Sequence, residues 1–483
     1  MARINTNVAS LTAQLGLSKS QKSLSSTLQR LSTGLRINSG EDDPAGLIAS
    51  EGLKSEMAGI SQAIDNSNRA SNVISTADGA LTEVSSLLTN IKSLIVQAAN
   101  TGGMSADEIQ ANQLQVDSAV ASITRISNTS SFAGLNLLNG SLDYVTSGVA
   151  ASAINSLSVN SANFGTRSVI PVNIQVVTSA QPANLLFPAS AITSSVTLEI
   201  SGKTGVSDIT LTSGTTASGI LSAINSISSV TGVQAAFINS AAPTSGVKFI
   251  STDYGSSAFV SVTAQKQAGG SSPSFTTTNN AGGLASRTVG VDAVATVNGA
   301  LSVGSGRDIH VNTVGLDMDF TLNKSVGTGS TSFNITGGGA MFQLGAAVNS
   351  NQQVSIGIGS VAATRLGNDE DGYLNSLVTG GKNSLVAGGA EAASNIVDDA
   401  INQIAVLRGR LGAFEKNTLD TNVNSLSVTL ENVTSAESDI ADADFASETS
   451  AMTRAQILTQ AGTSVLATAN STPQQVLSLL QGH

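Results

Sequence analysis

The sequence predicts a multidomain chain of helices, a β-rich α+β insert and helices again, with the two helical ends forming one unit. Apolar residues recur at every third or fourth position near both ends, which indicates amphipathic helices. Five of the seven prolines lie from Pro171 to Pro273, and residues 45–170 and 274–472 contain none. Because an internal proline costs a helix about 3 kcal/mol, these proline-free stretches permit long helices.

The first segment carries two short apolar seams at helical spacing. One consists of Ile4, Val8, Leu11 and Leu15, and the other of Leu24, Leu28, Leu31 and Leu35. Their spacing predicts a helix from 4 to 38. We expect this helix to end at the acidic break Glu41-Asp42-Asp43-Pro44, because a proline disfavours the α conformation in the residue before it.

Three further seams keep the same spacing of three and four residues. They are Ile74, Ala77, Leu81, Val84, Leu88, Ile91 and Ile95; Ile109, Gln113, Val116, Val120 and Ile123; and Leu419, Val423, Leu426, Leu430, Val433 and Ile440, the last interrupted by Glu437. Seams of this kind need partner helices. The spacing alone leaves two arrangements open, one compact bundle or helices that pair across the two ends of the chain.

The middle of the chain has the pattern of a β-rich module. Runs at 196–200, 259–264 and 320–322 favour strands bounded by Gly, Ser and Asn turns, and 217–228 favours a helix. The insert is too long to be a loop of a compact domain, so we expect a separate module. Two alternating runs around 349–352 predict a hairpin that leads back to helices at 391–440.

Composition argues against an enzyme and against a nucleic-acid or membrane partner. The chain has two His and no Cys, so the residue types that supply most acid–base, nucleophilic and metal-binding roles are scarce. Its net charge of −11 is the opposite of what a phosphate backbone requires. We expect no cleaved signal peptide, because no apolar core follows Met1, and no stretch approaches 18 consecutive apolar residues.

Three local motifs could suggest a ligand, and each has a simpler interpretation. His310 and the terminal His483 lie too far apart in sequence to indicate zinc, so neither a metal site nor a cofactor is expected. Asp369-Glu370-Asp371-Gly372 lacks the alternating oxygen ligands of a calcium loop and is interpreted as a solvated turn. The glycines at 337–339 are not followed by the Lys-Ser/Thr of a phosphate loop.

Three segments of the two ends resemble bacterial flagellin. They are Ile4-Asn5-Thr6-Asn7 with Leu28-Gln29-Arg30-Leu31-Ser32-Thr33-Gly34-Leu35-Arg36-Ile37-Asn38-Ser39 and Asp42-Asp43-Pro44-Ala45-Gly46-Leu47; Ser131-Phe132-Ala133-Gly134-Leu135-Asn136-Leu137-Leu138-Asn139-Gly140; and Leu411-Gly412-Ala413 with Ala467-Thr468-Ala469-Asn470 and Val476-Leu477-Ser478-Leu479-Leu480. Together they cover roughly the first and last 145 residues. The insert resembles the repeat module of flagellins around 222–226, 231–233 and 253–260.

The resemblance implies a discontinuous coiled-coil core formed by the N- and C-terminal regions, with a surface-exposed insert. The expected parts are an inner-core helix 1–43 paired with 441–483, outer-core helices and hairpin 44–165 with 335–440, and a variable insert 166–334. It implies a structural subunit that is exported unfolded by the flagellar type III system and polymerises into a motility filament. The residues expected in polymerisation seams are Val8, Leu11, Leu15, Leu28, Leu31, Leu35, Val465 and Leu466.

Further partners and contacts follow from the resemblance. The implied partners are further copies of the chain, the flagellar cap and hook-associated proteins, an export chaperone on the C-terminal helix and Toll-like receptor 5. The hairpin at 131–140 corresponds to one at subunit contacts that set the supercoil. The receptor motif Gln-Arg-Val-Arg-Glu-Leu-Ala-Val-Gln is weakened here: Leu94, Val96 and Gln97 match and Lys92 keeps a charge, but Asn90 replaces the first Arg.

Two other functions fit parts of the sequence. A hook–filament junction protein shares the structural class, although its ends are less similar to these. A β-rich adhesin with helical stalks would need an aromatic binding platform in the insert, which has few aromatic residues beyond Tyr144 and Tyr254. Peptide sequencing of sheared and sedimented surface filaments would distinguish the three.

Overall fold

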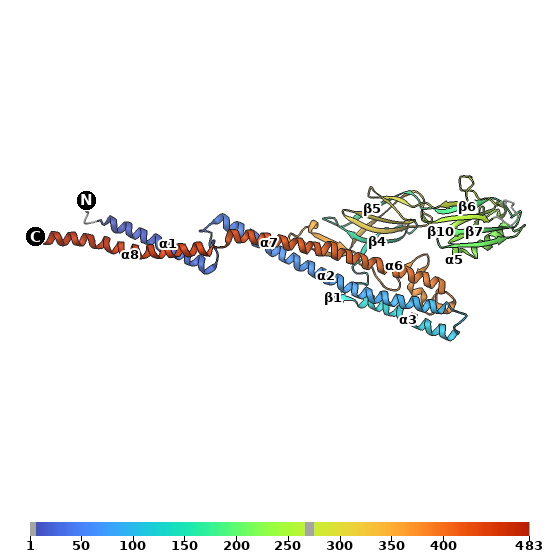
Figure 1. Ribbon diagram of the computed structural model, residues 1–483, viewed down its shortest axis with the longest axis horizontal. Coiled ribbons are helices and arrows are strands. Elements are labelled where there is room, and N and C mark those ends of the chain that lie inside the picture. The colour runs from blue at the N-terminus through green and yellow to red at the C-terminus, as the bar shows by residue number, and fades with distance from the viewer. Residues whose placement is uncertain (1–5, 266–274, 483) are drawn as a thin grey trace. The chain divides into compact units, whose positions relative to one another are not determined.

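The computed structural model describes residues 6–265 and 275–482, and their contacts divide them into two compact units (Figure 1). Unit 1 takes its described residues from 1–69, 343–348 and 416–483, and unit 2 from 70–342 and 349–415. The predicted order of helical ends around a β-rich insert is confirmed. The helices are α1 Val8–Thr33, α2 Pro44–Ala98, α3 Ala106–Thr129, α4 Ala217–Asn225, α5 Ser228–Thr231, α6 Ala390–Phe414, α7 Thr421–Ala441 and α8 Phe445–Gln481.

Short strands fill most of the region between α3 and α6. They are β1 Ser131–Phe132, β2 Leu135–Asn136, β3 Tyr144–Ser147, β4 Ile154–Ala162, β5 Ile170–Thr178, β6 Pro182–Phe187, β7 Val196–Gly202, β8 Val206–Leu211, β9 Val233–Phe237, β10 Val247–Tyr254, β11 Phe259–Gln265, β12 Arg287–Val289, β13 Val294–Val297, β14 Ala300–Val303, β15 Asp308–Thr313, β16 Leu316–Leu322, β17 Gly329–Gly338, β18 Ala340–Gln343, β19 Gln353–Ile356, β20 Gly367–Asn368 and β21 Gly372–Tyr373. The strands predicted at 196–200, 259–264 and 320–322 are therefore confirmed, as are the hairpins at 131–140 and around 349–352.

Helix α1 ends earlier than its apolar spacing predicts. Gly34 has a left-handed backbone conformation, with φ of 73°, and its N–H donates to the Arg30 carbonyl in a C-terminal cap. The predicted helix from 4 to 38 is therefore wrong at its end, and Ile4 lies outside the described residues. The Asp43-Pro44 pair instead starts α2: the Asp43 carboxylate accepts the Gly46 N–H at 2.9 Å, and Pro44 occupies the first helical position.

The helices of unit 2 bury the seams that the sequence predicts. In α2, the seven residues from Ile74 to Ile95 that keep the spacing of three and four are at most 1% exposed. In α3, Gln113, Val116, Val120 and Ile123 are buried, whereas the first member of the predicted seam, Ile109, is half-buried. The buried Gln113 side chain is satisfied, because its amide bonds the Leu377 carbonyl and the Leu385 N–H. The third helix, α6, buries Ile396, Val397, Ala400, Ile404 and Leu411.

The β-rich insert contains two apolar cores. The residues of the inner core form one continuous segment of the sequence, and the residues of the outer core come before and after that segment. The outer core joins the sheet β14-β13-β5-β17-β3 to β15-β16-β4, and the inner core joins β12-β11-β7-β8 to β6-β10-β9 with α4. Strands β3 and β4, which precede residue 166, pair with β17 and β16. Gln181 and Val291 bracket the inner core and exchange both backbone hydrogen bonds at 2.9 Å, so the chain enters and leaves that core at one point.

The predicted helix 217–228 is shorter in the structure, and its last residue contacts β9. The side chain of Asn225 accepts the Ala235 N–H at 2.8 Å and donates to the Ala235 carbonyl at 3.2 Å, which fastens the end of this helix to β9. Ser226 then bonds back to the Ala223 carbonyl through its hydroxyl. Helix α4 ends at Asn225, and a separate turn of helix follows as α5.

A half-buried arginine fastens α6 to the outer core of the insert. The Arg410 guanidinium donates to the Asn160 side-chain oxygen and, at 3.1 Å, to the Gly357 carbonyl. Asn160 in turn donates to the carboxylates of Asp317 and Asp319 on β16, at 2.9 and 2.7 Å. Burial lowers the pKa of Arg410, and the nearby carboxylates oppose that effect. Arg410 of α6 thus contacts β4 directly through Asn160, and the Asn160 amide extends the network to β16.

The acidic segment at 369–372 is a turn, as predicted, but its carboxylates are paired with protein groups and not merely solvated. Glu370 pairs with Arg307 and, at 2.9 Å, with Lys324. The Asn368 amide donates to Asp371 at 3.1 Å and to Asp399 of α6 at 2.6 Å. Partial burial, together with the carboxylates of Asp371, Asp398 and Glu370, raises the pKa of Asp399 to about 6.

This raised pKa makes the stability of unit 2 depend on pH. Ionised Asp399 costs the folded state free energy, so stability falls as pH rises from about 4 to about 6 and stays lower above that range. We expect Asp399→Asn to raise the free energy of unfolding at pH 7.5 by about 1 kcal/mol, after allowance for solvent screening. Thermal unfolding followed by circular dichroism measures the change. At pH 4 the gain should be small, and Asp369→Asn serves as the control; equal gains at both pH values would contradict the assignment.

Candidate assembly interface

Helices α1 and α8 of unit 1 pair antiparallel, although the residues that form them are more than 400 positions apart. Near the chain termini, the Asn7 amide donates to the Ala469 carbonyl at 2.8 Å and the Ser10 hydroxyl donates to Asn470 at 2.7 Å. Further along, the small Gly462 lets α8 approach Leu17 closely, because a Cβ built there would lie 3.4 Å from the Leu17 side chain. Small and polar residues therefore make much of the contact within the pair.

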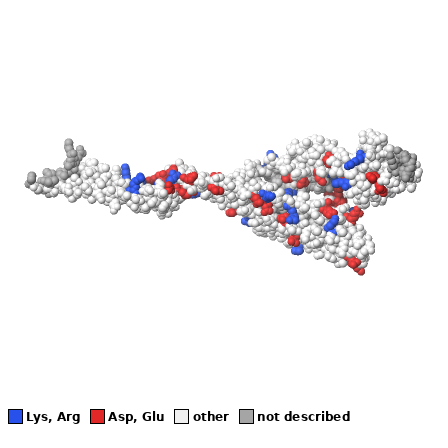
Figure 2. Space-filling view, in the orientation of Figure 1, with Lys and Arg blue, Asp and Glu red and all other residues white. Residues whose placement is uncertain are grey.

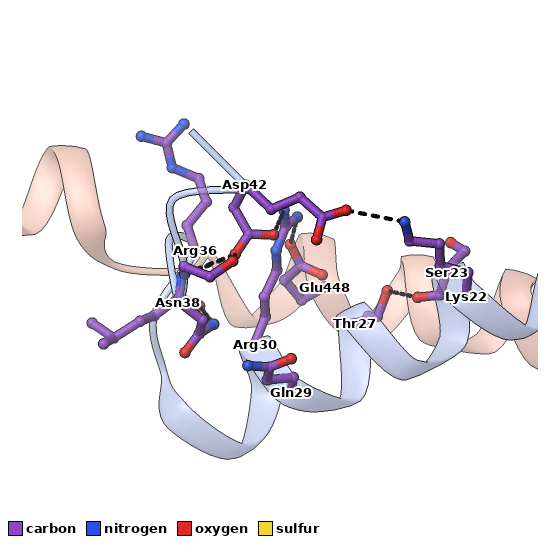
Figure 3. A network of polar contacts seen from close by, with 12 residues as sticks. Lys22, Ser23, Thr27, Gln29, Arg30, Arg36, Asn38, Asp42 and Glu448 are labelled. Atoms are coloured by element: carbon purple, nitrogen blue, oxygen red, sulfur yellow. Dashed lines mark hydrogen bonds and ion pairs between the residues drawn. The ribbon is translucent and has the colours of Figure 1, made fainter. Parts of the chain in front are cut away.

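The other end of the pair is held by Arg30, which Figure 3 shows between the turn after α1 and the start of α8. Its guanidinium lies 3.2 Å from the Glu448 carboxylate and 3.7 Å from that of Asp42. The Glu448 side chain is only 14% exposed, so removal of this partner would leave a largely buried carboxylate without a cation. By contrast, Lys22 and Glu41 pair at 3.1 Å with both side chains about 80% exposed, and such a pair adds little stability.

The turn between α1 and α2 bonds to the chain where α7 ends and α8 begins. The Arg36 N–H donates to the Ala441 carbonyl at 2.7 Å, and the Ala443 N–H donates to the Gly34 carbonyl at 2.9 Å. Within the turn, bonds from the backbone of Asn38 and the side chain of Ser39 lower the pKa of Asp42. Its carboxylate is thus kept ionised beside Arg30.

Most of the predicted polymerisation residues remain exposed in the single chain. Among the described side chains of α1 and α8, only Thr27 and Ala455 are buried. Val8, Leu11 and Leu15 are 57–61% exposed, Leu28 is 47% exposed and Val465 is 58% exposed. Leu31, Leu35 and Leu466 are half-buried. The side chains of Val476, Leu477, Leu479 and Leu480 lie outside the described residues.

Charged residues are almost absent from much of this helix pair. From 455 to 481 the chain has no Asp, Glu, Lys or Arg, and α1 has only Lys19, Lys22 and Arg30. Figure 2 shows the described surface of the pair near the chain termini as mostly white. An exposed helix surface that is apolar and uncharged loses little hydration when a partner covers it, which suits a protein–protein interface.

The residues of the weakened receptor motif lie on α2 in unit 2. As predicted, Ile91 and Ile95 are buried in the helical seam. Asn90, Val96 and Gln97 are exposed, and Leu94 is half-buried. Lys92 differs from expectation: its ammonium contacts the Ser394 hydroxyl at 2.6 Å and forms an ion pair with Asp398 of α6. It is therefore engaged within the chain and is not freely available to a receptor.

No metal-binding cluster occurs among the residues that the structure describes. His310 is exposed on β15, with its Nδ1 2.7 Å from the Asp319 carboxylate. Within 6–265 and 275–482, no three His, Cys, Asp or Glu side chains are grouped closely enough to hold a metal ion. None of the helices in these ranges is long and apolar enough to cross a membrane.

Sequence reasoning missed the polar contacts that fix the helix pair. Arg30 lies in the flagellin-like segment from Leu28 to Ser39. Its partner Glu448 is 418 residues away, and no sequence pattern around either residue indicates the pairing. The same is true of Asn7 and Ala469 and of Lys92 and Asp398. Only the order of apolar residues could be obtained from spacing.

Comparisons with known proteins agree with this architecture. A model of the bacterial flagellin N-terminal helical region matches residues 4–143, and one of the C-terminal helical region matches 394–480. The flagellin hook IN motif matches 197–253, within the inner core of the insert. A flagellin from Salmonella rubislaw is 31% identical over 99% of both chains. The chain belongs to the bacterial flagellin family.

Other relatives agree over the same length. The B-type flagellin of Pseudomonas aeruginosa is 32% identical, also over 99% of both chains. A solved structure of FliC from Burkholderia pseudomallei covers 72% of this chain and 99% of that one, at 15% identity and a TM-score of 0.26, which is too low to support a structural comparison. This chain is therefore a structural subunit of the flagellar filament and not an enzyme, and the two full-length flagellin matches disfavour the junction-protein and adhesin alternatives.

The Arg30 contacts give a direct test of the helix pair. We expect Arg30→Met to leave the carboxylates of Asp42 and Glu448 without a cation and to weaken the assembled filament by about 1–3 kcal/mol per subunit. The measurement is thermal dissociation of filaments followed by light scattering. Lys22→Met, which removes only an exposed ion pair, is the control and should change little. Equal effects of the two substitutions would show that Arg30 has no special role.

Proposed function

We propose that α1 and α8 are the polymerisation elements of this flagellin subunit and that the exposed apolar residues along them contact neighbouring copies. The observation that carries the proposal is the exposure of Val8, Leu11, Leu15, Leu28 and Val465 on a helix pair with almost no charge. Leu31, Leu35 and Leu466 extend the same surfaces as half-buried members.

The energetics favour association over a lone helix pair. Helices in proteins gain most of their stability from tertiary packing, and this pair buries only two of its described side chains. Burying an exposed Val or Leu contributes about 1.5–3 kcal/mol, so covering these residues in an assembly would supply what the single chain lacks. Contacts between different faces of identical subunits can repeat without closing, which generates a helical filament.

Several finer features of the function are also proposals. Export in an unfolded state suits a chain without Cys and with terminal helices that are weakly packed before assembly. The exposed apolar residues of α8, among them Ile457 and Leu458, suit an export chaperone that shields this helix. The flagellar cap and hook-associated proteins would meet the same surfaces at the ends of the filament.

The division into five parts supports this assignment of roles. We infer an inner core from 1–43 and 441–483, an outer core from 44–165 and 335–440, and a surface insert from 166–334. The support is that α1 contacts α8 while the nested β-rich cores form independently of that helix pair. On this division, polymerisation should depend on residues 1–43 and 441–483. It should tolerate loss of the part of the β-rich insert that lies between Gln181 and Val291.

The proposed interface predicts that removal of residues 450–483 abolishes polymerisation and leaves a soluble monomer. The physical reason is that α1 would lose its partner helix and the neutral surface of α8 would be absent. Sedimentation and electron microscopy of the purified protein provide the measurement.

A control deletion removes a larger segment that belongs to unit 2 and not to the helix pair. Replacing residues 182–290 by a short glycine linker should preserve filaments, because Gln181 and Val291 are already hydrogen-bonded neighbours. If the C-terminal truncation polymerises normally, the role of α8 is wrong. If the insert deletion folds but cannot polymerise, the insert takes part in assembly.

We also propose that this chain activates Toll-like receptor 5 only weakly. Asn90 cannot provide the forked donors of Arg, and Lys92 is engaged by Ser394 and Asp398. The double change Asn90→Arg and Ser93→Glu should increase receptor activation by roughly thirtyfold, equivalent to about 2 kcal/mol at a binding hot spot. A reporter-cell assay measures this, with Asn90→Gln and Ser93→Gln as the neutral control. Full activity of the unmodified chain would contradict the proposal.

A further inference from the structure

The apolar seam of α6 and α7 contains one irregular step. Through α6 it follows Ala400, Ile404, Leu407 and Leu411 at intervals of three and four residues and continues to the half-buried Phe414. The next buried residue is Leu419, five positions later. From there the intervals of four and three resume with Val423, Leu426, Leu430 and Val433, all half-buried.

A π-helix at Glu415–Asp420 spans this irregular step. Its i→i+5 hydrogen bonds place Phe414 and Leu419 on one face, which an ordinary α-helix does not do. Continued α-helical spacing from Phe414 would instead bring Thr418, Thr421, Ser425, Val428, Asn432 and Ser435 to the seam. The wider turn therefore resets the phase of the helix so that apolar residues stay buried on both sides.

The helix is intrinsically weak around this turn. Gly409 and Gly412 lie in the last two turns of α6, and a Cβ at either would meet nothing within 4 Å, so neither glycine is required by close packing. Glycine is among the least favourable residues in a helix interior. With Ile74, Asp78, Gly79, Arg408 and Glu415, these glycines line a hollow on the surface of unit 2. The hollow leaves this side of the helix without close packing.

Helix α2 is weak where the chain divides into its two units. The division crosses α2 between Arg69 and Ala70, and six of the eight residues at 65–72 are Asp, Asn or Ser. These residues have low helix propensity because their side chains compete for backbone hydrogen bonds. The same division crosses the π-helix between Glu415 and Lys416. Weak helical segments thus occur on both helices at the unit boundary.

Each end of the π-helix is anchored to α2 within its own unit. In unit 2, the Glu415 carboxylate accepts hydrogen bonds from the hydroxyls of Ser71 and, at 3.2 Å, Ser75. In unit 1, the Asn422 amide donates to the Ser67 hydroxyl at 3.1 Å and to the Leu344 carbonyl at 2.8 Å. The three serines recur every four residues, so they form one row along α2.

We propose that residues 409–420 form a joint at which the α6–α7 helix bends, with the serine row of α2 as its catch. The π turn and the two glycines supply the weak segment, and the hydrogen bonds of Glu415 and Asn422 to the serine row restrain it. Kinks in long helices occur at such π turns and glycines. The joint is a conformational property of the subunit and does not depend on the proposed polymer contacts.

Spin labels can measure the bending, since the chain has no native Cys. One pair of Cys substitutions replaces the exposed Val406 and Val428 on either side of the joint, and a control pair replaces the exposed Thr76 and Val96 within α2. Electron-resonance distance measurements on the full-length monomer should give a broader distribution for the first pair. Distributions of equal width would overturn the proposal.

Substitutions that strengthen the helix should narrow that distribution. Gly409→Ala with Gly412→Ala fits the open space and should slow hydrogen exchange at 409–420 by roughly twentyfold, from helix propensity alone. Gly52→Ala, also helical with open space, is the control and should leave 409–420 unchanged. Removing Asn417 shortens the five-residue step to four and should have the same slowing effect. If exchange and distances do not respond to either change, the joint is not at these residues.

Discussion

Helices α1 and α8 bury only Thr27 and Ala455 among their described side chains, although apolar residues recur along both. Contact between the two helices relies on small residues such as Gly462, on the Asn7 and Ser10 hydrogen bonds and on Arg30. Such a pair is fixed in direction and register but gains little from the hydrophobic effect. On the proposed assembly, this apolar surface is left for neighbouring copies, and the scarcity of charge lowers the cost of covering it.

The β-rich insert is organised so that changes of sequence in its inner core need not disturb the helices. The chain enters and leaves this inner core at Gln181 and Val291, which exchange paired backbone bonds, and Tyr254 of β10 packs against the outer core. The outer core is fastened to α6 by Arg410, whose guanidinium is shared between Asn160 and the Gly357 carbonyl. Breaking this contact would leave a half-buried cation without partners, which ties the orientation of the outer core to the helix.

A further constraint is that the apolar residues of α6 and α7 must face the same side of one continuous helix. The chain meets this constraint within a single turn. A heptad pattern cannot continue from α6 to α7 without bringing Thr and Ser into the seam, and the π-helix at Glu415–Asp420 corrects this by one wider turn. Serines of α2 satisfy the side chains at both ends of that turn. The correction places an irregular and weak segment at the boundary between the two units. The same segment therefore preserves packing and provides the place where bending costs least.

The sequence by itself determined the order of helices, β-rich insert and helices, the buried faces of α2 and α3 and the hairpins, because apolar spacing and turn residues act over a few positions. The family followed instead from the resemblance of the end segments to flagellin. The sequence did not locate the end of α1, where the left-handed Gly34 overrides a continuing apolar pattern, or the end of α4 at Asn225, whose side chain bonds β9. Tertiary structure alone decided that Arg30 meets Glu448, that Lys92 is held by Asp398 and that Arg410 reaches Asn160. These pairs are separated by hundreds of residues, and no local preference encodes which distant chain segment a charged side chain will meet.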